Sequence, residues 1–179
     1  NLDRYDDREI VTTNLIDSYY KIMEFVKKHL NDPFYLEGDI RISLRDKIFR
    51  EAVANSLVHR EYSSAYVAKM IIENSRVVFE NANIPHSYGE LKPSSFTPYP
   101  KNPNIAKVFR EIGFADELGS GVKNLYKYSK AYGGSDPIIT EGEVFKIVVQ
   151  TQLETTQETT QETTQEIKKL STKERVLEE

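Results

Sequence analysis

Apolar positions follow a helical period in the first part of the chain. Between Thr13 and Leu30 they recur every three or four residues, which predicts an amphipathic helix with Thr12 or Thr13 as its N-terminal cap. The segment Asn31-Asp32-Pro33 ends this helix, because a proline and the residue before it disfavour helical backbone.

A second helical pattern starts at Ser43, where an aspartate three residues later resembles a capping box, and it continues through the stretch from Arg50 to Tyr62. Within it Glu51, Asn55 and His59 recur every four residues along the border of the apolar face. Three polar side chains beside a core either bond to one another and to the backbone, or face a cavity that holds a ligand.

Beyond Tyr62 the pattern changes to that of strands and loops. Two apolar runs around a polar turn predict a hairpin, at Tyr66 to Ile72 and Val77 to Phe79. The region from Asn81 to Asn104 contains five prolines, which predicts a long loop that is either functional or mobile. The elements predicted after it are helices at 103–112 and 122–132 and strands at 137–140 and 144–149. This order favours an α+β two-layer sandwich, with a mixed or antiparallel sheet covered by helices.

The C-terminal part differs from the rest. Thr-Thr-Gln-Glu repeats three times between Glu154 and Glu166, a composition typical of a linker. Ser171-Thr172-Lys173-Glu174 resembles another capping box and predicts the start of a helix. We therefore expect a folded domain at 1–150, a low-complexity linker at 151–170, and the start of a further domain at 171–179.

Composition narrows the classes of function. A net charge of −4 argues against broad nonspecific nucleic-acid binding by this chain, because duplex affinity depends on Lys and Arg. The absence of cysteine excludes disulfides and thiolate metal sites and fits a cytoplasmic protein. The three histidines show no metal-ligand spacing, and no apolar run is long enough to cross a membrane.

A glycine-rich turn, Leu118 to Lys123, opens the last predicted helix. Gly119 and Gly121 at a helix start let backbone N–H groups approach an anion such as phosphate, and the helix dipole adds attraction. The alternative is a tight turn with ordinary glycines. Because Glu51 and Asn55 could supply a carboxylate near a water and an amide oxygen for Mg²⁺, the two groups together indicate a nucleotide site.

These motifs also resemble those of a known superfamily. Glu51-Ala-Val-Ala-Asn55 is similar to the E-x-x-x-N box of the GHKL ATPases, which include the gyrase B subunit, MutL and the histidine kinases. Residues 49–62, 101–104 and 117–122 together resemble the C-terminal ATPase-like domain of prokaryotic regulators called RecG-like or carrying an AlbA-type Schlafen domain. The resemblance spans Thr13 to Val149 and implies a Bergerat-type fold. The chain lacks a P-loop GKT or GKS, so no helicase motor is expected.

The resemblance implies a site for ATP or ADP with Mg²⁺. Asn55 would coordinate Mg²⁺ together with the phosphates, and Glu51 would orient or deprotonate the attacking water. The phosphates would be held by the residues of the glycine turn: Gly119, Ser120, Gly121 and Lys123. His59, on the same edge of the helix as Glu51 and Asn55, would also contact the nucleotide.

The superfamily's adenine-binding box, D-x-G-x-G, should fall between Phe79 and Pro85. Only its Ile-Pro ending is present there, and both glycines are absent. Glu80 or Asn81 would have to take the place of the missing aspartate, which contacts the adenine amino group in the superfamily.

Three functions remain open from the sequence. The first is an ATPase-like nucleotide-binding or sensor domain of a prokaryotic transcriptional regulator, which would contact DNA through a further C-terminal module. The second is a degenerate scaffold that binds no nucleotide, forms a homo-oligomer and positions the DNA-binding module. Glu51, Asn55 and His59 would then form a satisfied buried network. The third is a hydrolase unrelated to GHKL proteins.

Overall fold

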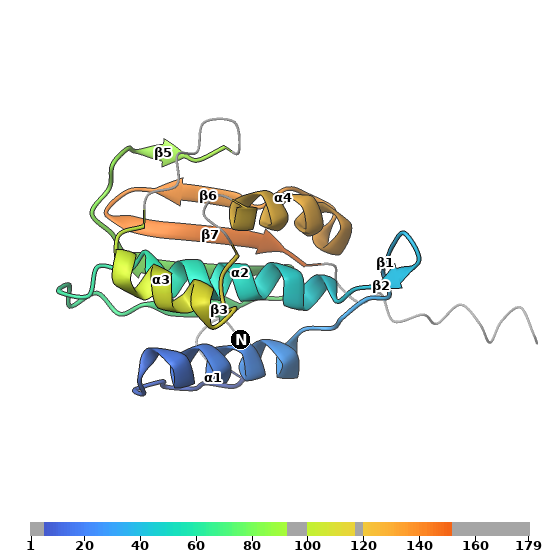
Figure 1. The fold of residues 1–179 in the computed structure, drawn as a ribbon, viewed down its shortest axis with the longest axis horizontal. Helices are drawn as coiled ribbons and strands as arrows, with labels where there is room; N and C mark the ends of the chain where they lie inside the picture. The colour runs from blue at the N-terminus through green and yellow to red at the C-terminus, as the bar shows by residue number, and fades with distance from the viewer. Residues whose placement is uncertain (1–5, 93–99, 117–119, 152–179) are drawn as a thin grey trace, which may run out of the picture.

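Helices pack on one five-stranded antiparallel sheet, and this two-layer arrangement confirms the predicted α+β class (Figure 1). The computed structural model describes residues 6–92, 100–116 and 120–151. The helices of this part are α1 (Leu15–His29), α2 (Leu44–Val58), α3 (Pro103–Glu111) and α4 (Ser120–Gly133). The predicted linker and the predicted start of a further domain lie outside the described residues, apart from Thr151.

The sheet has the strand order β3-β4-β7-β6-β5, with antiparallel neighbours throughout. Its strands are β3 (Lys69–Ile72), β4 (Arg76–Ala82), β5 (Gly89–Glu90), β6 (Ile138–Glu141) and β7 (Val144–Gln150). A separate small hairpin joins β1 (Leu36–Glu37) to β2 (Ile40–Arg41). Its turn contains Gly38, whose φ of +61° is readily adopted by glycine.

The four predicted helices and four predicted strands occur in the predicted order, while the structure adds β1, β2 and β5 and several boundaries differ. β4 is longer than predicted because it pairs along its whole length with β7, from Arg76 opposite Gln150 to Ala82 opposite Val144. β3 is shorter because its pairing with β4 begins at Lys69. β5 falls inside the region that the sequence predicts as loop.

The N-terminal caps show one correct and one wrong prediction. Ser43 caps α2 as predicted, since its Oγ accepts the Asp46 N–H at 3.0 Å. The cap of α1 is Asn14, and the prediction of Thr12 or Thr13 was wrong. Asn14 Oδ1 accepts the Asp17 N–H at 2.9 Å, whereas the Thr13 hydroxyl lies 3.1 Å from that of Ser18.

The core lies between the helices and the inner face of the sheet, with α2 in the middle of the helical layer (Figure 1). Ile48, Phe49 and Ala52 of α2 are fully buried against this face, to which β4 contributes Val77 and Phe79. α2 therefore has α1 on one side and α4 on the other, and its polar edge is held between elements that are far apart in the sequence. Among the described residues, no helix combines the length and apolar character that crossing a membrane requires.

Candidate functional site

Glu51, Asn55 and Gly121 meet where α2 faces the start of α4. The Asn55 Nδ2 donates to the backbone oxygen of Glu51 at 2.9 Å and to its Oε1 at 2.6 Å. Gly121 approaches the same carboxylate so closely that a Cβ on Gly121 would lie 1.7 Å from Glu51 Oε1. The structure thus brings together three of the residues that the sequence analysis assigned to one site, and a side chain at position 121 would displace the Glu51 carboxylate from its present position.

The surroundings of Glu51 favour its protonated form. Burial raises the pKa of this carboxyl to about 7, and the nearby charge of Asp116 acts in the same direction. The Asn55 side chain, the Arg50 charge and the Asp116 backbone N–H oppose the shift without cancelling it. A carboxyl with a pKa near neutrality can both accept and release a proton under physiological conditions, as general acid–base catalysis requires.

His59 lies two helical turns beyond Glu51 and belongs to a different environment. It is the C-cap of α2, and its ring stacks on Phe145 with the centroids 6.2 Å apart. Burial lowers the pKa of His59 to about 4, and the charge of Lys101 lowers it further, against an opposing effect of Glu141. The imidazole is therefore neutral at physiological pH.

Glu80 does not join the cluster. Its neighbours along β4, Phe79 and Asn81, are buried towards the helices, so Glu80 points to the opposite face of the sheet. There it lies between the ammonium groups of Lys69 and Lys146, at 2.9 Å from each. The hydrogen bonds from these two lysines lower the pKa of Glu80 to about 2, although burial acts against them. Because Glu80 lies on the face of the sheet opposite to α2, it does not take the place of the adenine-binding aspartate.

Asn81 is fully buried and acts as a brace between β4 and the end of α2. Its Nδ2 donates to the backbone oxygens of Ala82 at 3.0 Å and His59 at 3.4 Å, and its Oδ1 accepts from Ser56 at 3.5 Å. Because these bonds occupy both ends of the carboxamide, Asn81 is a structural residue in this conformation.

The glycine turn is described only from Ser120 onward. Ser120 starts α4, and Lys123 is exposed one turn later on the same helix. Gly119 lies outside the described residues. Among those that are described, no group of three His, Asp or Glu side chains is arranged to hold a metal ion, so a Mg²⁺ ion would depend on Asn55 and on ligand oxygens.

Sequence reasoning missed a second polar cluster beside His59. Glu141 on β6 accepts from the His86 backbone N–H at 3.0 Å and from the Ser87 hydroxyl at 2.9 Å. Lys101 donates to Glu141 Oε1 at 3.4 Å and to the backbone oxygen of Ile84. The two side chains are only 15% and 10% exposed, so this is a largely buried ion pair that ties the two ends of the 83–102 region together.

Asn102 holds the end of α2 from the same side. Its Nδ2 donates to the backbone oxygens of Val58 at 2.9 Å and Arg60 at 2.8 Å. The sequence analysis placed Asn102 in a long loop and in one of the segments of the resemblance, and it gave Asn102 no role of its own. No pattern in the sequence indicates that Asn102 caps the end of α2, because Asn102 and Val58 come together only in the folded chain.

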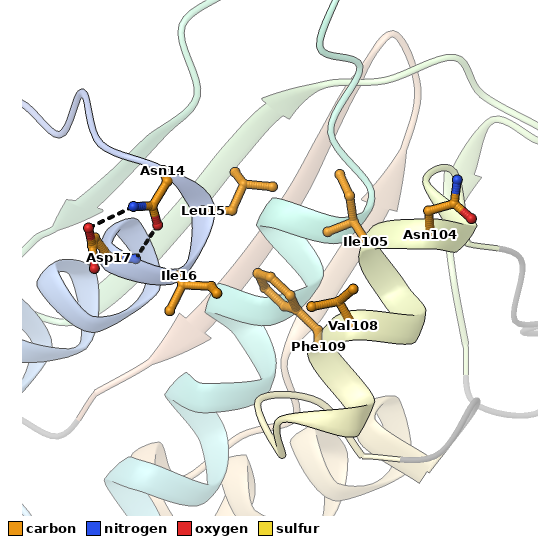
Figure 2. Close-up of a pocket in the computed structure, with 8 residues that line it drawn as sticks. All are labelled: Asn14, Leu15, Ile16, Asp17, Asn104, Ile105, Val108 and Phe109. Atoms are coloured by element: carbon orange, nitrogen blue, oxygen red, sulfur yellow. Dashed lines mark hydrogen bonds between the residues drawn. The ribbon is translucent and has the colours of Figure 1, made fainter.

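A groove of about 550 Å³ lies elsewhere, between the first turn of α1 and the exposed side of α3 (Figure 2). Its lining is mostly apolar and includes Leu15, Ile16, Ile105, Val108 and Phe109. The hydrogen bonds of Asn14 and Asp17 at its edge serve to cap α1. The groove is thus separate from the polar edge of α2.

Comparison with known proteins shows the fold. No model of a protein family matches the chain, and no curated protein matches it. Among solved structures, the DIP2311 protein from Corynebacterium diphtheriae is similar, with a TM-score of 0.57 and 22% sequence identity. The similarity covers 76% of this chain and 28% of that one, so the chain spans less than a third of the length of that protein.

Proposed function

We propose that the chain is an ATPase-like nucleotide-binding or sensor domain of a prokaryotic transcriptional regulator. The observation that supports this proposal is the contact of a half-buried Glu51, whose pKa is raised to about 7, with Gly121 at the start of α4 and with Asn55 one turn away. A carboxyl near neutrality, a carboxamide and a helix N-terminus are the groups that phosphate chemistry needs.

The residues of this edge fit Mg²⁺-nucleotide binding. Asn55 turns its Nδ2 towards Glu51, and its Oδ1 is an oxygen of the kind that Mg²⁺ prefers. A bound Mg²⁺ would neutralise phosphate charge. Glu51 would accept a proton from water, and the backbone at Gly121 would face the phosphates.

A degenerate scaffold is the second candidate, and a different observation favours it. Asn81 is occupied by structural hydrogen bonds and Glu80 by ion pairs on the opposite face, so neither replaces the missing adenine-binding aspartate. In this function the bond between Asn55 and Glu51 is a satisfied internal contact, and the domain would serve to position a DNA-binding module.

Thermal unfolding with Mg²⁺-ATP and Mg²⁺-ADP distinguishes a nucleotide-binding domain from a degenerate scaffold. A nucleotide site predicts a rise in Tm, since a ligand at a hundred times its Kd stabilises the folded state by about 2.7 kcal/mol. Asn55→Ala should abolish the rise. Glu51→Ala should keep the rise and lose any hydrolysis, because Glu51 would act on water. Glu24→Ala, which changes an exposed carboxylate on α1, is the matched control and should behave as the unaltered chain.

The scaffold predicts the reverse pattern. No nucleotide up to millimolar concentration would change Tm, and Asn55→Ala would destabilise the protein by about 1–3 kcal/mol through the loss of its bonds to Glu51. That combination of results would contradict the nucleotide-binding proposal.

A further inference from the structure

Asp116, in the loop between α3 and α4, lies beside the Glu51 carboxyl. Its backbone N–H donates to that carboxyl, and the charge of its own carboxylate acts on it. The Asp116 side chain is held in turn by α4, because its Oδ2 accepts the Asn124 Nδ2 at 2.7 Å. The two carboxyl groups are therefore neighbours in the fold, although the sequence separates them widely.

One turn of α4 contacts both carboxyl groups. Gly121 and Asn124 are three residues apart, so they lie on the same face of this helix. Gly121 approaches Glu51 so closely that a Cβ there would lie 1.7 Å from Oε1, while Asn124 donates to Asp116. The first turn of α4 thus fixes Glu51 by close packing and Asp116 by a hydrogen bond.

The loop that carries Asp116 is itself anchored to the first two helices. Phe114 stacks on Tyr19 of α1 with the ring centroids 3.9 Å apart. The Arg50 guanidinium of α2 donates to the backbone oxygen of Gly113 and, at 3.3 Å, to the Tyr19 hydroxyl. Because these contacts tie the loop to α1 and α2, the charge of Asp116 stays at a fixed position beside α2.

Few other charges act on Glu51 within the part of the chain that the structure describes. Arg50, its neighbour on α2, acts in the opposite direction to Asp116. From α1, the Tyr19 hydroxyl lies near Glu51, and at the start of α4 the charged side chain of Lys123 is exposed. The charge of Asp116 is therefore one of the two that decide whether Glu51 carries a proton.

We propose that Asp116 is a positioning residue for Glu51, which holds the Glu51 carboxyl against α4 by its backbone N–H and places a second negative charge beside it. This inference rests on the proposed nucleotide-binding function. A like charge nearby favours the protonated form of a carboxyl, so Asp116 makes Glu51 a stronger acceptor for the proton of the attacking water. Asp116 acts through Glu51, and Asn124 keeps its charge in place.

An NMR titration of the full chain tests this inference, with isotope-labelled glutamate carboxyl carbons and the Glu51 signal assigned by its loss in Glu51→Gln. Asp116→Asn removes the charge but keeps the backbone N–H and an acceptor for Asn124. In this variant the midpoint of the Glu51 titration should fall by at least about 0.5 pH unit. Glu24→Gln, which removes an exposed carboxylate from α1, is the matched control and should leave the midpoint unchanged.

Nucleotide measurements connect this midpoint to the proposed function. Asp116→Asn should keep the rise in Tm with Mg²⁺-ATP, because Asp116 acts on Glu51 and not on the phosphates. The low-pH limb of the rate of ATP hydrolysis should move to lower pH by the same amount as the Glu51 midpoint. A merely structural role of Asp116 would lower the rate at every pH and leave that limb in place.

The outcomes separate this inference from the function on which it rests. An unchanged Glu51 midpoint in Asp116→Asn would overturn the role of Asp116 and leave nucleotide binding intact. The absence of any nucleotide response in the unaltered chain would overturn the proposed function, and with it the use of Asp116 in hydrolysis. If circular dichroism shows that Asp116→Asn does not fold, Asn124→Ala decides, since it releases the Asp116 side chain: a lower Glu51 midpoint supports the inference, and an unchanged one overturns it.

Discussion

At the scale of single residues, the contact between Glu51 and Gly121 joins the two helices that frame the candidate site. The carboxylate occupies the space that a side chain at position 121 would need. Gly133, at the other end of α4, is just as confined, since a Cβ there would lie 1.9 Å from the backbone oxygen of Gln150. The two glycines differ in what blocks them: a movable side chain at one, a strand backbone at the other.

This difference gives the first prediction. Gly121→Ala should destabilise the fold by about 1–3 kcal/mol, because Glu51 must leave its bond with Asn55. In a Glu51→Ala background the same change should cost little, which a double-mutant cycle by urea unfolding would measure. Gly133→Ala should cost more than Gly121→Ala and should not be relieved by Glu51→Ala. Equal costs of Gly121→Ala in both backgrounds would contradict the contact.

The pKa of Glu51 leads to a pH-dependent prediction. The folded pKa of about 7 lies above the usual value of 4.5, so the folded state binds more protons between these pH values. The contribution of Glu51 is therefore fully present below about pH 4.5 and is lost as the pH rises through 7. Relative to Glu51→Gln, a neutral isostere, the unaltered chain should lose roughly 3 kcal/mol of unfolding free energy between pH 5 and pH 8.

Denaturant unfolding of both proteins across this pH range provides the measurement. His59 has the opposite dependence, because its folded pKa of about 4 lies below the usual 6.5 and its contribution is lost as the pH falls. Since His59 is present in both proteins, its effect cancels in the difference. A difference between the two proteins that does not change with pH would show that Glu51 titrates normally.

At the scale of elements, α2 depends on side chains from distant segments at its C-terminal end. The Tyr62 hydroxyl donates to Leu57 O at 2.7 Å, Asn102 to Val58 O and Arg60 O, and Asn81 to His59 O. The last turn of a helix leaves backbone oxygens without intrahelical partners, and here three side chains supply them. The end of α2 is therefore fixed by tertiary contacts, whereas its start is fixed by the local cap at Ser43.

The contact of Asn102 with this helix end gives the third prediction. Asn102→Ala should lower the unfolding free energy by about 1–3 kcal/mol, because the oxygens of Val58 and Arg60 would lose their partner. Asn104→Ala, two residues along the chain and exposed, is the matched control and should stay within about 0.5 kcal/mol. A similar small cost for both variants would mean that water replaces Asn102 at the helix end.

These elements also show what the sequence could predict. Periodicity found α1, α2, α3 and α4 and the strands β3, β4, β6 and β7, because each buries one face in a regular pattern. It missed β5, whose two residues follow no pattern of their own and pair only because β6 lies beside them. The edge with Glu51 and Asn55 was visible as a four-residue spacing. The roles of Asn102, Lys101 and Glu141 were not, because they arise from contacts between segments that the sequence separates by dozens of residues.

At the scale of the whole molecule, charge limits which partners the chain can bind by itself. The net charge is −4, and the lysines on the outer face of the sheet are partly neutralised: Lys69 and Lys146 both pair with Glu80. Affinity for duplex DNA grows with the number of phosphates that Lys and Arg neutralise. Because Lys69 and Lys146 already pair with Glu80, the outer face of the sheet contributes little to DNA binding.

The last prediction follows from the negative net charge and from the pairing of these lysines with Glu80. In fluorescence anisotropy at physiological salt, the chain should bind duplex DNA more weakly than about 10⁻⁴ M, the weak end of nonspecific binding by basic proteins. Glu80→Gln would free Lys69 and Lys146 from their shared partner and should strengthen any residual binding, with a steeper dependence on salt. Glu24→Gln makes the same change in net charge away from these lysines and should have a smaller effect. Micromolar binding by the unaltered chain would place DNA contacts on this domain itself. The proposal that a separate module makes the DNA contacts would then be wrong.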